Sequence, residues 1–310
     1  MRILLIGCTG FIGKELIPKL IEEGHSLCII SRKNIDKLKF KVELKKIIFL
    51  KLDLSIEQNW RNKNLHQNLK NADGIINLIG EPIADKRWTD QQKQKIFTSR
   101  VNTTFFLMKT IKTLRLKPKV IINGSAIGYY GTSIKKEFNE KSNKGSDFLA
   151  HLCEKWEAAA NQKPFFTRLV ILRIGIVIES DGGALGKMLP IFKLGLGGPV
   201  GDGKQWMSWI HRTDLCGLII CAIKNKNFSG VYNAVSPEPT TMDNFSNILA
   251  NCLNKPNSIP VPSIPLKLLI GEGAKLVLEG QKVLSIKITK NLYKFKYPLL
   301  EKALFAATKK

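Results

Sequence analysis

Three glycines follow the first apolar run of the chain, and this arrangement constrains the fold more than any other feature. Residues 2–6 (RILLI) have the composition of a short buried strand, and residues 11–23 have the apolar spacing of a helix. Gly7 permits a tight turn between them, Gly10 lets backbone N–H groups approach a pyrophosphate, and Gly13 lets the helix pack against the strand. We therefore predict a dinucleotide-binding loop, whose cofactor contacts come from Gly7, Thr9, Gly10, Phe11, Ile12 and Gly13.

Short apolar runs alternate with longer amphipathic stretches through the first half of the chain. This pattern predicts βαβ units that build a parallel sheet. Each apolar run is nearly continuous, as expected for strands that helices cover on both faces. The predicted fold is therefore α/β, a Rossmann-type doubly wound parallel sheet. The predicted strands are 2–6, 26–31, 47–52, 74–79, 119–124 and 168–174, and the predicted helices are 11–23, 56–70, 89–115 and 146–162.

The pattern changes after Ile178, where residues 182–205 become rich in glycine. We predict a long shaped loop there, and not another βα unit. The elements predicted beyond it are a strand and helix over 209–222, a strand at 230–234, a helix at 242–252, an extended connector at 256–265 and helical spacing up to Ala306.

This change of pattern predicts two domains. The first is an NADP-binding Rossmann domain over residues 1–178, to which residues 206–235 return. The second is a smaller C-terminal substrate lobe, made of residues 179–205 and 236–310.

The end of the second predicted strand distinguishes the two nicotinamide dinucleotides. NAD sites place an Asp or Glu there for the ribose 2′-hydroxyl, whereas NADP sites place a cation there for the 2′-phosphate. This chain has Ser31, Arg32 and Lys33 at that point. Arg32 offers a planar fork of N–H donors and Ser31 a hydroxyl, so we predict that both contact the cofactor and that the cofactor is NADP(H). The alternative is a solvated turn in a Lys-rich protein.

The chain carries 49 Lys and Arg against 25 Asp and Glu, a net charge of +24, which raises the question of a nucleic-acid partner. Only nine of these cations are Arg, the residue that best recognises phosphates and base edges, and the Lys residues are spread along the chain. We therefore predict no nucleic-acid partner. Nucleic-acid binding, as the alternative, rests on the charge alone.

The sequence predicts neither a membrane partner nor a metal site. It shows no signal-peptide pattern, and no uninterrupted apolar run approaches the ~18 residues that a spanning helix needs. The six cysteines form no CxxC pair, and the four histidines show no metal-site spacing. We expect a cytoplasmic protein with buried free thiols.

Several blocks of the sequence, taken in order, resemble one family. They are GCTGFIG at 7–13, NLIGEP at 77–82, SAIGYYG at 125–131, DFLAHLCEKWEAAA at 147–160, SWIHRTDL at 208–215 and LLIGEGAKLVLEGQKVL at 268–284. On these blocks the chain resembles, from end to end, the epimerase-like family of atypical extended short-chain dehydrogenases/reductases. Members are often described as NAD-dependent epimerases of sugar nucleotides or as cell-division inhibitor homologues, and they have a distinctive C-terminal domain.

The resemblance implies further cofactor residues, which are Asp53, Leu54, Leu78, Ile79, Gly80, Glu81 and Arg100. It implies that the Asp53 carboxylate accepts from the exocyclic amine of adenine, and that Gly80 and its neighbours line the nicotinamide ribose. From the residues alone, a helix-capping Asp53 and a surface Arg100 are equally good interpretations. Gly80 has independent support, because a strand that ends in glycine lets a ligand approach the backbone.

Catalysis departs from the pattern that the resemblance implies. Extended short-chain enzymes use Tyr-x-x-x-Lys, in which the Lys lowers the pKa of the Tyr, and a nearby Ser positions the substrate oxygen. The helix that would carry this pair begins near Asp147, and it has neither the Tyr nor a Lys four residues later. Ser125 fills the Ser position. We predict Ser125 as a catalytic residue, with Tyr129 as a second candidate.

The function implied by the resemblance is an NADP(H)-dependent oxidoreductase or epimerase that acts on a small molecule, with a nucleotide-linked sugar as one candidate. Lys187, Lys193 or Lys204 of the glycine-rich block would meet an anionic group, and Trp206 and Trp209 would form an aromatic wall. The missing pair favours an alternative, a non-catalytic NADPH-binding regulator or scaffold linked to cell or plastid division. The sequence leaves the oligomeric state open.

Overall fold

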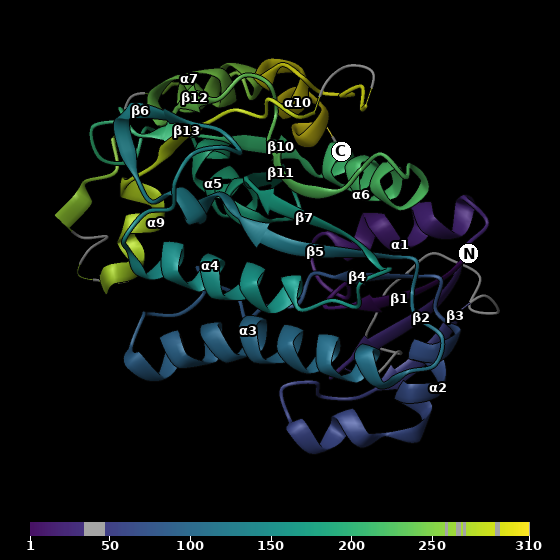
Figure 1. Ribbon diagram of the computed structural model, residues 1–310. Coiled ribbons are helices and arrows are strands. Elements are labelled where there is room, and N and C mark those ends of the chain that lie inside the picture. Colours follow the sequence, from purple (N-terminus) through teal and green to yellow (C-terminus); the bar gives the residue numbers. More distant parts are fainter. Residues whose placement is uncertain (34–46, 258–259, 265–267, 269–270, 289–291, 310) are drawn as a thin grey trace.

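A parallel sheet of seven strands forms the centre of the structure, which is a computed structural model that describes residues 1–33, 47–257, 260–264, 268, 271–288 and 292–309 (Figure 1). All neighbouring strands run parallel. In spatial order the strands are β11 (Gly230–Ala234), β7 (Arg168–Ile174), β5 (Val120–Ala126), β4 (Gly74–Asn77), β1 (Arg2–Ile6), β2 (Ser26–Ser31) and β3 (Ile47–Lys51). The strand order reverses between β1 and β4, and ligands bind at such a point in open α/β sheets.

The six strands predicted in the first half of the chain are confirmed, with ends that differ by two residues at most. The late strand predicted at 230–234 is also confirmed, and it pairs with β7 at the sheet edge. Strands β1, β4 and β5 are buried on both faces along almost their whole length, which explains their continuous apolar runs. The predicted Rossmann-type α/β fold is therefore confirmed.

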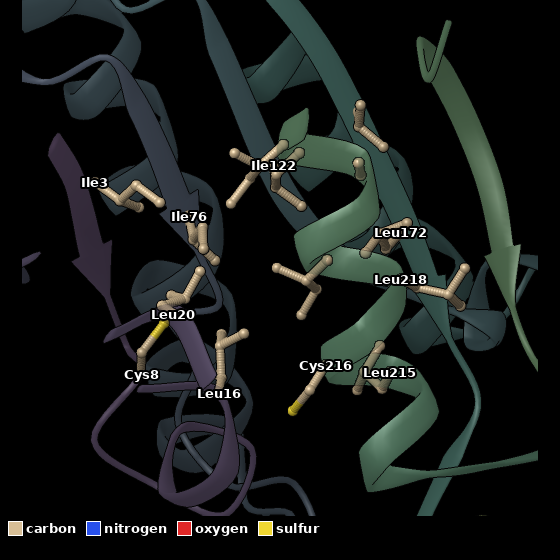
Figure 2. Close-up of a cluster of buried hydrophobic side chains, with 14 of the residues drawn as sticks. Ile3, Cys8, Leu16, Leu20, Ile76, Ile122, Leu172, Leu215, Cys216 and Leu218 are labelled. Carbon is tan, nitrogen blue, oxygen red and sulfur yellow. The ribbon is translucent and has the colours of Figure 1, made fainter. Parts of the chain in front are cut away.

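Helices cover both faces of the sheet. On one face lie α1 (Gly13–Glu22) and α6 (Arg212–Lys224), and Figure 2 shows Leu16 and Leu20 of α1 and Leu215 and Leu218 of α6 in the same apolar core. The other face is covered by three helices, α2 (Lys63–Asn71), α3 (Asp90–Thr113) and α4 (Phe148–Asn161).

Side-chain caps explain where these helices begin. The Thr89 hydroxyl accepts from the Gln92 amide at the start of α3, and the Asp147 carboxylate accepts from the Ala150 amide at the start of α4. The helix predicted over 56–70 is divided into a short 3₁₀ helix, η3 (Glu57–Arg61), and α2. Extended Asn62 separates the two and caps α2, which a pattern of apolar spacing does not reveal.

The glycine-rich block contains a helix, so the prediction of a long loop without another strand and helix is wrong. Strand β8 (Ile176–Glu179) leads into α5 (Gly183–Lys193). Leu185, Leu189 and Phe192 lie on one face of α5 and are buried, and this spacing was a helical signal that the neighbouring glycines obscured. Within α5, only the first residue, Gly183, has a positive φ, of 62°.

A second core joins the remaining elements. It is formed by three helices, α5, α7 (Met242–Cys252) and α10 (Leu300–Thr308), and by three strands, β8, β9 (Trp206–Met207) and β10 (Trp209–His211). Strand β10 pairs with β8, and β9 pairs with β12 (Thr240–Thr241). Strand β6 (Ser133–Phe138) pairs with β13 (Gln281–Val283). Shorter elements are η4 (Ile127–Tyr130), η5 (Gly271–Ala274) and α9 (Lys275–Leu278).

Two predictions for the last third of the chain need comment. Helical spacing up to Ala306 is wrong for residues 281–288 and 292–299, because these described residues form β13 and irregular chain. The Lys296 and Tyr297 amides donate to the Asp214 carboxylate at 2.6 and 2.9 Å, and not to a backbone carbonyl one helical turn earlier. The connector predicted over 256–265 falls partly outside the described residues. Within the described part of the chain, no helix is long and apolar enough to cross a bilayer.

Candidate functional site

The glycine loop joins β1 to α1 at the carboxyl edge of the sheet. Gly7 has φ 73°, and a Cβ there would lie 2.4 Å from the Cα of Ile79. A Cβ on Gly13 would lie 1.5 Å from the Cys8 carbonyl oxygen, whereas a Cβ on Gly10 would meet nothing within 4 Å. Gly7 and Gly13 are therefore required by packing, and Gly10 faces open space beside the first turn of α1. In that turn the Lys14 amide donates to the Gly10 carbonyl, and the Glu15 and Leu16 amides donate to the Ile12 carbonyl.

The loop side chains are held from two sides. The Phe11 ring packs on Gly182 and lies 4.9 Å below the Arg212 guanidinium, so Phe11 offers a ligand its backbone and not its ring. The Thr9 hydroxyl lies 3.2 Å from the hydroxyl of Ser31 at the end of β2. These two hydroxyls join the glycine loop to the neighbouring strand.

Arg32 and Glu81 meet above the end of β1. The Arg32 guanidinium is 65% exposed and lies 3.7 Å from a Glu81 carboxylate oxygen, and Lys86 lies 3.6 Å from the other oxygen. Arg32 follows β2 and Glu81 follows β4, and β1 lies between these strands. An exposed cation therefore stands beside the glycine loop, on the side where Ser31 lies.

Asp53 and Leu54 follow β3, the next strand at this edge. The Asp53 carboxylate accepts from the backbone amide and hydroxyl of Ser55 at 2.9 and 2.6 Å, so it fixes the turn before η3. Leu54 is buried in the core beneath it, and its carbonyl accepts from the Trp60 indole. Asp53 does not cap η3, whose N-cap is Ile56 without a side-chain bond, so the alternative interpretation as a helix cap is wrong. Both Ser55 bonds go to one carboxylate oxygen of Asp53.

The end of β4 is held by Arg100 of α3. Arg100 donates to the Glu81 carbonyl at 2.9 Å, and a Cβ on Gly80 would lie 2.6 Å from its guanidinium. Burial lowers the pKa of Arg100 to about 10, and the guanidinium lies 5.5 Å from the centre of the Trp156 ring. The interpretation of Arg100 as a surface residue is therefore wrong. It fixes the Gly80–Glu81 backbone, and Leu78 and Ile79 precede this point.

A cavity of about 1300 Å³ opens beside this edge. It brings together six of the predicted site residues, which are Ile12, Leu78, Ile79, Gly80, Arg100 and Ser125. Its wall includes the aromatic side chains of Trp88, Phe148 and Trp156, and also charged side chains, among them Lys93, Lys136, Lys144 and Lys275. Residues of β6, η5 and α9 close the far side. The cavity is therefore continuous from the first turn of α1 to the C-terminal part of the chain.

The helix α4 presents Leu149 and Cys153 to this cavity, four residues apart on one face. The family's Tyr and Lys would stand four residues apart on this helix. The α4 residues in the described lining, Phe148, Leu149, Leu152, Cys153 and Trp156, include neither type. Burial raises the pKa of the Cys153 thiol to about 12, so it stays protonated at neutral pH. Neither Leu149 nor Cys153 replaces the missing acid–base pair.

Ser125 belongs to a buried network that the sequence did not reveal. Its hydroxyl donates to the Glu157 carboxylate at 2.7 Å, and Arg173 donates to both oxygens of that carboxylate at 2.8 Å. Arg173 also donates to the Tyr130 hydroxyl at 2.9 Å, and Tyr130 donates to Asn233 at 2.7 Å. Ser125 and Tyr130 line the cavity, so the network forms part of its floor.

Charge and burial oppose each other in this network. Glu157 and Arg173 are 6% and 4% exposed. Burial alone would lower the pKa of Arg173, but the hydrogen bonds and charge of Glu157 outweigh it and raise the pKa above its usual range. Burial also raises the pKa of the Tyr130 hydroxyl. The signal in the sequence was a cation, Arg173, inside an otherwise apolar strand, because a buried charge needs a partner.

Tyr129 lies outside the cavity lining. Its ring stacks on the Arg173 guanidinium, 3.4 Å from ring centre to Cζ, and packs edge to face against Tyr130. Within the described lining, Tyr130 and not Tyr129 provides the phenol group. The structure thus separates the two catalytic candidates, since Ser125 reaches the cavity and Tyr129 supports the network behind it.

The glycine-rich block contributes less to the cavity than predicted. Lys187 pairs with Asp85 at 2.8 Å, and none of Lys187, Lys193 and Lys204 belongs to the described lining. Trp206 lines the cavity, but Trp209 is fully buried in the core with its indole donating to the Glu238 carbonyl, so the prediction that Trp209 forms an aromatic wall is wrong. His211 is also buried and caps α6 by accepting from the Thr213 amide. Among the described residues no cluster of His, Cys, Asp and Glu could hold a metal.

Comparison with known proteins gives matches over the whole chain. The NAD dependent epimerase/dehydratase family matches residues 3–235, and a domain of unknown function, DUF1731, matches residues 261–307. The chain is 36% identical over 308 residues to the chloroplastic epimerase family protein SDR39U1 homolog of Arabidopsis thaliana, covering 99% of this chain and 86% of that protein. It is 36% identical to epimerase family protein SDR39U1 of Mus musculus, with 98% of both chains covered.

Two solved structures extend this comparison. The crystal structure of human epimerase family protein SDR39U1 with NADPH superposes with a TM-score of 0.88 at 34% identity, covering 100% of this chain and 99% of that one. UDP-glucuronic acid 4-epimerase from Bacillus cereus, in complex with UDP-glucuronic acid and NAD, superposes with a TM-score of 0.76 at 20% identity and shows the shared fold. The chain belongs to the NAD dependent epimerase/dehydratase family.

Proposed function

We propose that the protein is an NADP(H)-dependent oxidoreductase that interconverts an alcohol and a carbonyl group on a small molecule held in the cavity. One observation carries the proposal. The glycine loop with Arg32 beside it and the Ser125 hydroxyl stand at the same edge of the sheet, and the cavity runs from Ile12 to Ser125. The same cavity therefore borders the proposed cofactor site and a hydroxyl that can bind a substrate oxygen. An epimerase reaction would use the same alcohol and carbonyl step.

The residues at the sheet edge fit a phosphorylated dinucleotide. The open space at Gly10 and the positive end of the α1 helix dipole suit a pyrophosphate. Exposed Arg32, next to the Ser31 hydroxyl, suits a 2′-phosphate. We propose that Asp53 and Leu54 border the adenine, and that Leu78, Ile79 and Gly80 border the nicotinamide ribose. The human relative with NADPH supports the choice of NADP(H).

The chemistry divides between the cofactor and the chain. Bound NADP(H) would supply or accept a hydride. The chain would position the substrate oxygen with Ser125 and exclude water with the apolar wall of Trp88, Phe148 and Leu149. Arg100 would act by holding the backbone at Gly80, since its guanidinium already bonds the Glu81 carbonyl.

We propose a substrate with a largely apolar body, because the wall around Ser125 is apolar and aromatic. A nucleotide-linked sugar, such as the one in the Bacillus cereus enzyme, is the rival class. Lys187, Lys193 and Lys204, which were expected to meet its phosphates, do not belong to the described lining, although four other lysines do, Lys93, Lys136, Lys144 and Lys275. Competition by UDP-glucuronic acid against an aromatic ketone separates the two classes.

A reaction assay tests the proposal. Wild type and Ser125→Ala are mixed with NADPH and 9,10-phenanthrenequinone, an aromatic diketone, and NADPH loss is followed at 340 nm. We expect turnover by the wild type and a loss of about 100-fold in Ser125→Ala, the range of one positioned proton-transfer group. Equal rates in both proteins would contradict the proposed role of the site.

A second candidate function is a non-catalytic NADPH-binding regulator or scaffold. The observation that favours it is the absence of the usual acid–base pair from the α4 residues in the described lining. Tight NADPH binding with no NADPH loss, across a panel of ketones, aldehydes and nucleotide sugars, would support this function over the first.

Two predictions from the sequence remain proposals. A cytoplasmic location is tested by cell fractionation. The expected lack of a nucleic-acid partner is tested by binding to random duplex DNA over a range of salt concentrations, where retention at physiological salt would contradict it.

A further inference from the structure

Glu157 lies directly behind Ser125, one turn beyond Cys153, which is one of the α4 residues that line the cavity. Leu149, Cys153 and Glu157 are spaced by four residues and share one helix face. Leu149 and Cys153 line the cavity, whereas Glu157 does not belong to the described lining. Ser125 stands between the cavity and the carboxylate, 2.7 Å from the Glu157 oxygen. A proton from the cavity can therefore reach Glu157 through Ser125.

The direction of this hydrogen bond sets what Ser125 offers to a ligand. A serine hydroxyl has one proton and two lone pairs, and the ionised carboxylate can only accept. Because Ser125 gives its proton to Glu157, it presents lone pairs to the cavity. While Glu157 is a carboxylate, Ser125 is thus arranged to accept a hydrogen bond from a substrate hydroxyl. In the reverse direction, towards a carbonyl, protonated Glu157 would return its proton through Ser125.

We propose that Glu157 is the positioning residue that makes Ser125 the proton acceptor for a substrate hydroxyl. The proposal rests on the proposed oxidoreductase function. The proton of the substrate O–H passes to Ser125 Oγ as the Ser125 proton passes to Glu157 Oε1. Glu157 changes from carboxylate to carboxylic acid, and the electron pair left on the substrate oxygen forms the carbonyl bond as hydride leaves the carbinol carbon for the oxidised cofactor.

The surroundings of Glu157 suit this role. Arg173 of β7 holds the carboxylate in place with two hydrogen bonds. Tyr130 of η4 bonds the same guanidinium, and Tyr129 stacks on it. Cys153, on the same helix, is a further titratable group beside Ser125, and burial keeps it neutral. With these partners in place, Ser125 connects the Glu157 carboxylate to a ligand in the cavity.

A variant that keeps the hydrogen bond but not the basicity separates positioning from simple packing. In Glu157→Gln the amide oxygen still accepts from Ser125, but it cannot take the proton. Because this change leaves Arg173 buried without a countercharge, Glu157→Gln with Arg173→Met supplies a neutral version of the pair. Glu154→Gln, one turn earlier on the same helix, is the control, since its carboxylate pairs with Lys144 and does not reach Ser125.

The test combines two readouts. Carboxyl-¹³C-labelled glutamate gives a resonance for Glu157, assigned by its loss in Glu157→Gln, and we expect Ser125→Ala to move it. Oxidation of 1-indanol by NADP⁺ is then followed between pH 5.5 and 8.5. We expect kcat to fall about 100-fold in both Glu157→Gln variants, and we expect these variants to lack the decrease in kcat at acid pH that the wild type shows. The NADPH affinity and melting temperature of the double variant should stay close to those of the wild type.

The outcomes distinguish this inference from the proposed function. A resonance unmoved by Ser125→Ala, or a double variant with the rate and pH profile of the wild type, overturns the role of Glu157 alone. A wild type that binds NADPH but oxidises no 1-indanol, while the resonance does move, overturns the oxidoreductase function for this class of alcohol and the proton transfer with it.

Discussion

The Arg32 guanidinium and the Glu81 carboxylate face each other 3.7 Å apart across the end of β1, beside the glycine loop. In the proposed complex a cofactor 2′-phosphate would compete with Glu81 for Arg32. Arg32 should therefore raise the affinity for NADP(H), and Glu81 should lower it.

Replacing Glu81 with Gln tests this competition. Because the change frees Arg32 from an exposed ion pair, we expect NADPH to bind about two- to fivefold more tightly, the size typical of such a pair. NADH, which lacks the 2′-phosphate, serves as the control ligand and should bind as it does to the wild type. Fluorescence titrations with both cofactors measure the effect, and equal gains for both would contradict the competition.

Gly10 and Gly13 are expected to respond differently to alanine. Gly13→Ala places a Cβ 1.5 Å from the Cys8 carbonyl oxygen, so we expect a large loss of thermal stability. Gly10→Ala meets nothing within 4 Å, so it should fold normally but lose about tenfold in NADPH affinity, or about 1.4 kcal/mol, because the methyl group occupies the proposed pyrophosphate space. Calorimetry and titration give both values. A stable Gly13→Ala protein would argue against the loop geometry.

Replacing Arg173 alone should destabilise the protein more than replacing Arg173 and Glu157 together. Arg173→Met leaves the Glu157 charge buried without its countercharge, and we expect a loss of about 3–5 kcal/mol in the free energy of unfolding. Glu157→Gln with Arg173→Met removes both charges and should recover much of that loss. Urea unfolding of the wild type and these variants forms the test, and additive losses would contradict a coupled pair.

Glu15 should contribute an acid-sensitive part of the stability. Burial alone would raise its pKa, but hydrogen bonds from Lys19, Thr213 and Arg212 outweigh it and lower the pKa to about 2 from 4.5. A lowered folded-state pKa stabilises the protein above the unfolded value, and this contribution is lost as pH falls from about 4.5 towards 2. The gap in melting temperature between wild type and Glu15→Gln should therefore shrink from pH 6 to pH 3. A gap that stays constant would contradict this assignment.

The sheet and the glycine loop were predictable because their signals are local. Continuous apolar runs gave the strands, and the strand, glycine and helix order gave the loop at residues 7–13. The helix α5 was missed because neighbouring glycines obscured the spacing of Leu185, Leu189 and Phe192. The strand β13 was missed because its partner, β6, lies far away in the sequence.

The candidate site was less predictable than the fold, since it depends on distant contacts. Ser125 was found from its place after the fifth strand. Its partner Glu157 is 32 residues away, and the bond between Tyr130 and Asn233 spans 103 residues. Tyr129 and Tyr130 are adjacent in the sequence, and only the backbone of η4 decides which of the two reaches the cavity.

The most direct test of the account is a side-by-side titration of wild type and Arg32→Ala with NADPH and NADH. Because Arg32 is proposed to bind the 2′-phosphate through charged hydrogen bonds, we predict that the variant loses about 10- to 100-fold in affinity for NADPH and little for NADH. A wild type that binds both cofactors equally, or a variant that loses the same affinity for both, would contradict the assignment of NADP(H) to this site.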